Sequence, residues 1–239
     1  MGTGTSGFGG DSVQARHPDY PAVLRRAWEL GITFWDTAHS YGTHAHVRRA
    51  LQEVPRQDLT LASKTHAVTA AQAREAVERA LEEMATDRIE VMLLHEVDTP
   101  QDLEARLPAL GELHRCRRQG LVAAVGLSTH AIEVLERAAG RPDIQVLFTN
   151  YNVANLHMDA SMGDYERALQ RAFQSGQGVY VHKTLAEGRL AHRLEEALAH
   201  NLTRPFVHSV CVGLTSVEEV EKLAALAAAI APPPAPSRP

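Results

Sequence analysis

Short apolar runs alternate with amphipathic helical stretches along nearly the whole of this chain of 239 residues. The alternation is typical of βα units whose strands lie side by side in a parallel sheet. Eight apolar runs are expected to be strands, at residues 2–6, 32–36, 59–63, 89–94, 122–127, 145–150, 178–182 and 209–213. Eight units in this length predict an α/β fold of the TIM type, a (β/α)8 barrel, rather than an open doubly wound sheet.

The domain organisation follows from where this alternation stops. We expect one barrel domain over residues 1–231 and a disordered Pro-rich tail at 232–239, because proline cannot continue a helix. The glycine-rich start GTGTSGFGG is not followed directly by a helix. It is therefore expected to be a loop after the first strand rather than a dinucleotide-binding fingerprint.

Several helix boundaries can be located from capping residues and apolar stripes. Thr69 with Gln72, and Ser216 with Glu219, each have the spacing of a capping box. A leucine stripe predicts a helix before Gly120. Its members are Leu103, Leu107, Leu110 and Leu113.

Composition excludes several classes of function. A formal net charge of -5 and a pI near 6.2 provide no basic surface for nucleic acid or for an anionic membrane. No apolar run is long enough to span a bilayer and no signal peptide is evident, so a cytoplasmic location is expected. Cys116 and Cys211 lack the spacing of a disulfide framework or a metal-binding motif.

Charged and polar residues stand where three neighbouring strands are expected to end. Period-two alternation directs Asp36, Lys64 and His95 to the same face of their strands as the apolar residues before them. The carboxyl ends of barrel strands meet at one mouth, so these side chains are expected to converge there. Lys64 then becomes the counter-ion that a buried Asp36 requires, and Tyr41 can reach the same mouth from the following loop.

This set of groups is suited to reducing a carbonyl compound. An ammonium group beside a phenol is expected to lower the pKa of Tyr41 from its reference of about 10, which makes Tyr41 a general acid. Asp36 would hold Lys64 charged, and His95 would donate a hydrogen bond to the substrate oxygen. The hydride must come from a cofactor.

The motifs around these residues resemble those of the aldo-keto reductase family. GITFWDTAHSYG, LTLASKT and ALEEMATDRIEVMLLHEVD are similar to the segments that carry the family's aspartate, tyrosine, lysine and histidine. The resemblance implies NADP or NAD as cofactor, a small-molecule carbonyl substrate, and Asp36, Tyr41, Lys64 and His95 as a catalytic tetrad.

The same resemblance implies a set of cofactor contacts. Ser128 and Thr129 match the residues that hold the nicotinamide carboxamide, Asn152 matches a further amide contact, and His182 matches an aromatic residue that stacks on the ring. The segment VGLTSVEEVEKL matches the part of the family that contacts the adenosine end of the cofactor. Its implied contacts are Gly213, Thr215, Ser216 and Glu219.

Two departures from the family pattern concern this chain in particular. Glu219 stands where a basic or amide side chain usually meets the adenosine 2′-phosphate, which predicts weak discrimination between NADPH and NADH. The segments GLSTH and VGLTSVEE are most similar to a bacterial branch that often carries a C-terminal iron-sulfur module. This short chain has no cysteines for such a module, and the lack of a long C-terminal loop predicts an open pocket.

Two other functions are compatible with the same residues. Lys64 could form a Schiff base in a lyase, although a nearby Asp36 keeps its amine protonated. A cofactor-binding or regulatory protein with weak catalysis is the second alternative. Neither the carbonyl substrate nor the oligomeric state can be deduced from the sequence.

A histidine-rich loop raises the question of a metal site. His39, His44 and His46 are close in sequence, but no carboxylate or cysteine nearby completes a ligand set. They are therefore expected to form an exposed polar helix edge, and no metal site is predicted.

Overall fold

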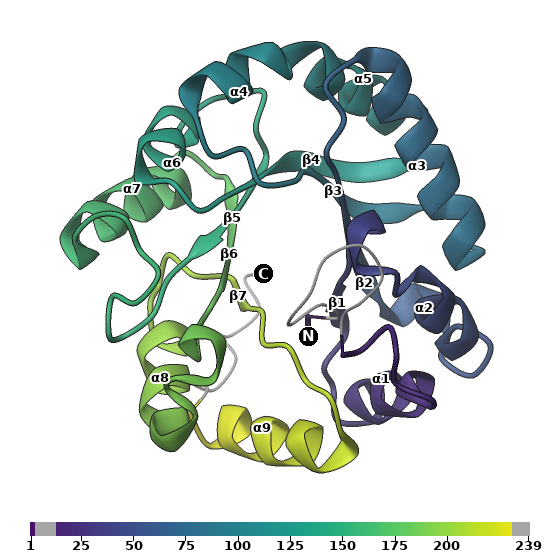
Figure 1. Cartoon of the computed structure of the whole chain (residues 1–239), viewed down its shortest axis with the longest axis vertical. Coiled ribbons are helices and arrows are strands. Elements are labelled where there is room, and N and C mark those ends of the chain that lie inside the picture. Colours follow the sequence, from purple (N-terminus) through teal and green to yellow (C-terminus); the bar gives the residue numbers. More distant parts are fainter. Residues whose placement is uncertain (3–12, 231–239) are drawn as a thin grey trace, which may run out of the picture.

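The computed structural model describes residues 1–2 and 13–230, which form a curled parallel sheet with helices around its outside (Figure 1). Within these residues, seven strands pair in chain order, from β1 to β7, and each pair is parallel. They are β1 Phe34–Asp36, β2 Thr60–Thr65, β3 Ile89–Leu94, β4 Val122–Thr129, β5 Val146–Asn150, β6 Gly178–His182 and β7 Ser209–Val210.

Seven of the eight predicted strands are therefore present, and six of them end within two residues of the predicted limits. β7 is three residues shorter than predicted. The first predicted strand, at 2–6, lies from residue 3 onward outside the described residues, as does the predicted tail at 232–239. Gly2 forms isolated parallel bridges to Asp36 and to Gly213, so it touches the two edges of the curled sheet.

The helices alternate with these strands, as the sequence predicts. The α-helices are α1 Tyr20–Glu29, α2 His44–Ala50, α3 Ala70–Met84, α4 Pro100–Ala105, α5 Leu107–Arg118, α6 Ile132–Ala138, α7 Met162–Gln174, α8 Leu194–Leu202 and α9 Val217–Ile230. Short 3-10 turns are η1 His39–Tyr41, η2 Arg56–Asp58, η3 Ala186–Gly188 and η4 Ala191–Arg193.

Two helix predictions have different outcomes. The capping box at Thr69 forms in full, because its hydroxyl accepts from the Gln72 N–H while the Gln72 side chain accepts from the Thr69 N–H. The leucine stripe before Gly120 does not lie on one helix, since α4 ends and α5 begins around Arg106. Pro108 has no N–H and cannot continue the hydrogen bonding of α4, which explains the break.

The concave face of the sheet has its own apolar cluster, separate from the core between sheet and helices. Phe148 and Tyr180 stack there with ring centroids 3.9 Å apart. The buried members of this cluster are Ala62, Val91, Leu93, Phe148, Tyr180 and Cys211. They fill the space beneath the carboxyl ends of the strands, so a polar group at those ends sits on an apolar floor. None of the helices within the described residues is long and apolar enough to cross a bilayer.

Candidate active site

Four predicted side chains converge at the carboxyl ends of β1, β2 and β3. Asp36, Lys64 and His95 are each at most 4% exposed. Lys64 Nζ lies 2.6 Å from Asp36 Oδ1, and the Tyr41 hydroxyl lies 3.4 Å from both Lys64 Nζ and His95 Nε2. Lys64 also donates to the Thr37 carbonyl at 2.7 Å. The buried carboxylate at the end of β1 thus has the counter-ion that the sequence predicts.

The second oxygen of Asp36 has a partner that sequence reasoning missed. The hydroxyl of Tyr180, on β6, donates to Asp36 Oδ2 at 2.9 Å from across the curled sheet. A signal was present, because period-two alternation directs Tyr180 to the same face as His182. With both oxygens engaged, Asp36 cannot turn away from Lys64.

The electrostatics of this group differ in one respect from expectation. Burial tends to lower the pKa of Lys64, but the Asp36 carboxylate and the Tyr41 hydroxyl outweigh it, and the pKa lies above its usual value. Burial raises the pKa of Tyr41 by more than the adjacent Lys64 ammonium lowers it. The predicted lowering of the Tyr41 pKa is therefore wrong, since the extent of burial outweighs the neighbouring charge.

His95 is held as a neutral imidazole. Burial, with the nearby Lys64 charge, lowers its pKa far below the usual range for histidine. Its backbone is fixed by the buried guanidinium of Arg106, which donates to the carbonyls of Thr65, Ala67 and His95 at 2.9 to 3.1 Å. Arg106 thus ties the ends of β2 and β3 together. Sequence reasoning missed this residue because its partners are backbone atoms, which no side-chain pattern reveals.

A cavity of about 250 Å³ opens beside Lys64. Its walls come from η1, the end of β2 and the first half of α3, and they include His39, His66, Glu75 and Arg79. The opening lies beside Ser40 and Lys64 and is large enough for a small organic molecule.

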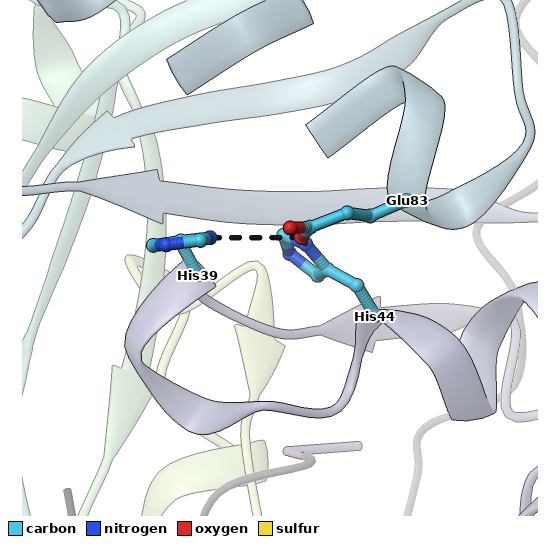
Figure 2. A group of neighbouring side chains, drawn as sticks. All are labelled: His39, His44 and Glu83. Carbon is cyan, nitrogen blue, oxygen red and sulfur yellow. Dashed lines mark hydrogen bonds and ion pairs between the residues drawn. The ribbon is translucent and has the colours of Figure 1, made fainter. Parts of the chain in front are cut away.

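The histidine-rich loop is not the exposed helix edge that was predicted. His44 is buried, and its Nδ1 lies 2.6 Å from Glu83 Oε2 while its Nε2 lies 3.0 Å from Ser63 Oγ. His39 faces the same carboxylate, with Nδ1 3.6 Å from Glu83 Oε2 (Figure 2). His46 points elsewhere, to the carbonyl of Ala15. The sequence argument failed because Glu83 comes from α3, 39 residues beyond His44.

The side chains expected to contact a nicotinamide amide are engaged with the protein itself. Ser128 Oγ accepts from the Glu96 N–H at 2.9 Å. Thr129 Oγ1 accepts from the Ala131 N–H at 3.0 Å. The Asn152 side chain is fully buried and forms three hydrogen bonds within residues 152–156.

Asn150, two residues before Asn152, offers an amide that the sequence reasoning missed. Its Nδ2 donates to the His157 carbonyl, but its buried Oδ1 has no hydrogen-bond partner within residues 1–2 and 13–230. It pairs in register with His182, the residue expected to stack on a nicotinamide ring. The pattern FTNYN did not distinguish the two asparagines.

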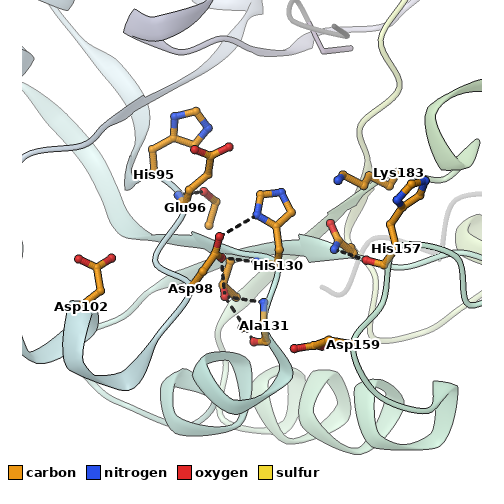
Figure 3. A network of polar contacts seen from close by, with 12 residues as sticks. His95, Glu96, Asp98, Asp102, His130, Ala131, His157, Asp159 and Lys183 are labelled. Atoms are coloured by element: carbon orange, nitrogen blue, oxygen red, sulfur yellow. Dashed lines mark hydrogen bonds and ion pairs between the residues drawn. The ribbon is translucent and has the colours of Figure 1, made fainter. Parts of the chain in front are cut away.

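His182 sits in an aromatic and histidine-rich corner of the mouth. Its ring lies 4.4 Å from that of Phe148 and 5.2 Å, edge-on, from that of His130. Asp98 Oδ1 accepts from the backbone N–H of His130 at 2.7 Å, and Asp98 Oδ2 lies 3.2 Å from His130 Nδ1. Figure 3 shows this pair at the centre of a polar network. Burial, with the nearby charges, lowers the pKa of His182 well below the usual range.

The start of α9 corrects a further prediction. Ser216 Oγ accepts from the Glu219 N–H at 3.2 Å, which is half of a capping box. The Glu219 carboxylate does not return to the Ser216 N–H. It accepts instead from the N–H and hydroxyl of Thr215, at 2.7 and 2.9 Å. Thr215 offers the carboxylate two donors, its N–H and its hydroxyl, whereas Ser216 would offer only one N–H.

Comparison with known proteins places the chain in a family. The model of the Aldo/keto reductase family matches residues 1–229. L-galactose dehydrogenase of Arabidopsis thaliana is 25% identical over 269 aligned positions, which cover 93% of this chain and 82% of that protein. A soybean (Glycine max) protein named "Probable aldo-keto reductase 1" is 29% identical over 149 positions, 56% of this chain and 42% of its own length.

Solved structures give the same fold. An aldo-keto reductase from Klebsiella pneumoniae, in complex with NADPH, superposes with a TM-score of 0.73 at 24% identity. The match covers 95% of this chain and 84% of that one. The chain spans less than half of the soybean relative but most of the Arabidopsis and Klebsiella proteins.

Proposed function

Because this chain belongs to the aldo/keto reductase family of NAD(P)-dependent oxidoreductases, we propose that it reduces an aldehyde or ketone to an alcohol, with Tyr41 as the proton donor. One observation carries the proposal: the Tyr41 hydroxyl lies 3.4 Å from both the Lys64 ammonium and the His95 imidazole. A phenol that stays protonated in the buried site, beside a fixed cation that can stabilise its anion, can act as a general acid towards a bound carbonyl oxygen.

The residues present are compatible with a nicotinamide cofactor, NADP or NAD, which when bound supplies a hydride to the carbonyl carbon. The unpartnered Oδ1 of Asn150 could accept from the carboxamide, and His182 could support the ring. Ser128 and Thr129 would contribute only by exchanging their present hydrogen bonds. We therefore assign the amide contact to Asn150 rather than to Asn152.

Each member of the group has a separate role in this proposal. The Tyr41 hydroxyl donates its proton to the substrate oxygen, and the Lys64 ammonium stabilises the phenolate that results. Asp36 keeps Lys64 charged and in place. A neutral His95 can donate one hydrogen bond to the same substrate oxygen and orient it, with Ser40 Oγ 3.5 Å from its Nδ1.

The Schiff-base alternative is disfavoured by the same contacts. A lysine nucleophile must lose its proton, whereas Asp36 raises the pKa of Lys64 and holds its nitrogen at 2.6 Å. The weakly catalytic, cofactor-binding alternative makes a different prediction in the experiment below.

For the fold, the two bridges of Gly2 and the family assignment support a closed eight-stranded barrel in one domain.

The experiment combines cofactor binding with turnover. NADPH and NADH fluorescence should change on titration with the protein, and a panel of aldehydes, ketones, quinones and sugar carbonyls should include a substrate. Tyr41→Phe should reduce kcat by about 10²- to 10⁴-fold and leave cofactor affinity unchanged.

Tyr151→Phe is the matched control, because that hydroxyl bonds to Glu166 rather than to any of the four residues at the mouth. Retained turnover in Tyr41→Phe would exclude Tyr41 as the acid. Binding without turnover on the whole panel would favour the regulatory alternative.

A further inference from the structure

Three side chains of the types that can bind a metal ion, from three different elements, meet beside the mouth. His39 comes from η1, His44 begins α2 and Glu83 lies near the end of α3 (Figure 2). One ligand atom from each lies within 4.8 Å of the others. We propose that this cluster binds a divalent transition metal ion of the zinc type through His39 Nδ1, His44 Nδ1 and a Glu83 carboxylate oxygen.

The donor set determines which metal it suits. Two imidazole nitrogens and one carboxylate oxygen are ligands that Zn²⁺ accepts in sites that keep an open position for water. Calcium and magnesium prefer oxygen ligands alone, so this cluster selects against them. With metal–ligand distances of about 2.0–2.2 Å, neighbouring ligand atoms of a tetrahedral site lie about 3.4 Å apart.

The present distances are close to those values. His39 Nδ1 is 3.6 Å from Glu83 Oε2, which already fits two ligands of one ion. His44 Nδ1 is nearer to the same oxygen, at 2.6 Å, because the two now share a hydrogen bond. An ion would replace that proton and would need the pair to separate by less than about 1 Å.

The second nitrogen of His44 supports its role as a ligand. Nε2 lies 3.0 Å from Ser63 Oγ, a buried hydroxyl on β2. Ligand histidines usually donate their other N–H to a protein acceptor, which fixes the ring orientation and leaves the free nitrogen toward the metal. Nδ1 of His44 is the nitrogen that this contact leaves for an ion.

The surrounding charges do not exclude a cation. Arg79 Nη1 lies 3.4 Å from His39 Nε2, on the side of the ring away from Nδ1. Its guanidinium is also paired with Glu75, which offsets the positive charge. His39 is half exposed, so an ion can enter from solvent.

An ion at this cluster would connect η1 to α2 and α3. His39 is two residues before Tyr41 on the same turn, so the ion would restrain the segment that carries the Tyr41 hydroxyl. A second group, His66, His95 and Glu96, also has its ligand atoms within 4.8 Å of one another. The experiment must therefore tell the two groups apart.

The full-length chain, freed of metal with a chelator, is titrated with Zn²⁺ in competition with a chromogenic zinc indicator. We expect one equivalent to bind and the thermal midpoint to rise. Glu83→Gln and His39→Ala should each weaken binding by at least about tenfold. His39 is exposed, so His39→Ala should keep the fold even if Glu83→Gln does not, and circular dichroism checks both.

Two controls complete the design. Glu82→Gln changes the exposed neighbour of Glu83, and His66→Ala removes the second group; both should leave the Zn²⁺ affinity unchanged. Co²⁺ bound in place of zinc should show the strong visible absorption of a tetrahedral site, which Glu83→Gln abolishes. If His66→Ala removes the binding and Glu83→Gln does not, or if no equivalent binds, the proposed site is wrong.

Discussion

The two sides of the mouth are built in different ways. At β1 to β3, side chains distant in sequence bond to one another, as Asp36 does to Lys64 and to Tyr180. On the side of the later strands, several polar side chains bond within their own loop, as Asn152 does to residues 154–156 and Glu219 to Thr215. The first side is fixed by the tertiary fold, while the second can exchange its hydrogen bonds for those of a ligand.

The largest expected effect comes from removing the charge at the centre of the first side. Lys64→Met leaves Asp36 as a buried, unpaired carboxylate, which should lower the free energy of unfolding by about 3–5 kcal/mol and abolish turnover. Chemical denaturation measures the loss. Lys183→Met, which breaks the half-exposed pair with Glu187 on the other side, should cost no more than about 1 kcal/mol. Equal losses would refute the contrast between the two sides.

Acid should destabilise both sides through His95, which is buried, and His182, which is partly buried. The pKa values of His95 and His182 are lowered by burial, so the folded state holds both rings neutral. The unfolded chain binds these protons below about pH 6.5, and stability is therefore lost as pH falls through that value, by about 1.4 kcal/mol per histidine for each pH unit.

Unfolding free energies at pH 7.5, 6.5 and 5.5 test this dependence. In His95→Gln, the slope of the unfolding free energy against pH should become smaller by the contribution of one histidine. In His192→Gln, which changes an exposed histidine, the slope should stay as in the wild type. A stability that is level between pH 7.5 and 5.5 would contradict the neutral state of these rings in the folded protein.

A smaller effect is expected where one side depends on the other. Tyr180→Phe removes the donor to Asp36 Oδ2 and should cost about 1–3 kcal/mol, because a buried carboxylate oxygen loses its partner. Turnover should fall as Lys64 is less firmly held, while cofactor affinity stays the same. Unfolding curves and steady-state kinetics together would sharpen the comparison, and a loss as large as that of Lys64→Met would mean that Tyr180 does more than position Asp36.

The smallest effect concerns the loop-bound side alone. Glu219 places a carboxylate at the start of α9, where a 2′-phosphate would otherwise meet helix N–H groups, so the wild type should discriminate weakly between NADPH and NADH. Glu219→Arg should shift the preference toward NADPH by about tenfold, as measured by calorimetric titration of both cofactors. A wild type that already prefers NADPH by about a hundredfold or more would show that other residues bind the phosphate.

How far the sequence predicts this molecule depends on the range of the interaction. Period-two alternation was enough to bring Asp36, Lys64 and His95 together, because it is a property of each strand alone. Tyr180 and Glu83 were missed, since their partners are set by the curvature of the sheet and by helix packing.

Quantities that depend on burial were harder still to predict from the sequence. The pKa of Tyr41 was predicted to fall because Lys64 is adjacent, but the depth of the site, which no sequence pattern gives, raises it. The break between α4 and α5 was visible as Pro108, although the leucine stripe obscured it. Local hydrogen-bond geometry decided between Ser216 and Thr215 as the partner of Glu219.

The hydrogen bond from Tyr180 to Asp36 also has a consequence for synthesis of the chain on the ribosome. The two residues are separated by 144 positions, which at about 5–20 residues per second amounts to roughly 7 to 30 s of translation. For most of that interval the nascent chain holds both Asp36 and Lys64 but lacks the tyrosine that donates to the carboxylate. A chain that stalls before β6 therefore leaves Asp36 without its Tyr180 partner, and the edge of β5 without the strand that pairs with it.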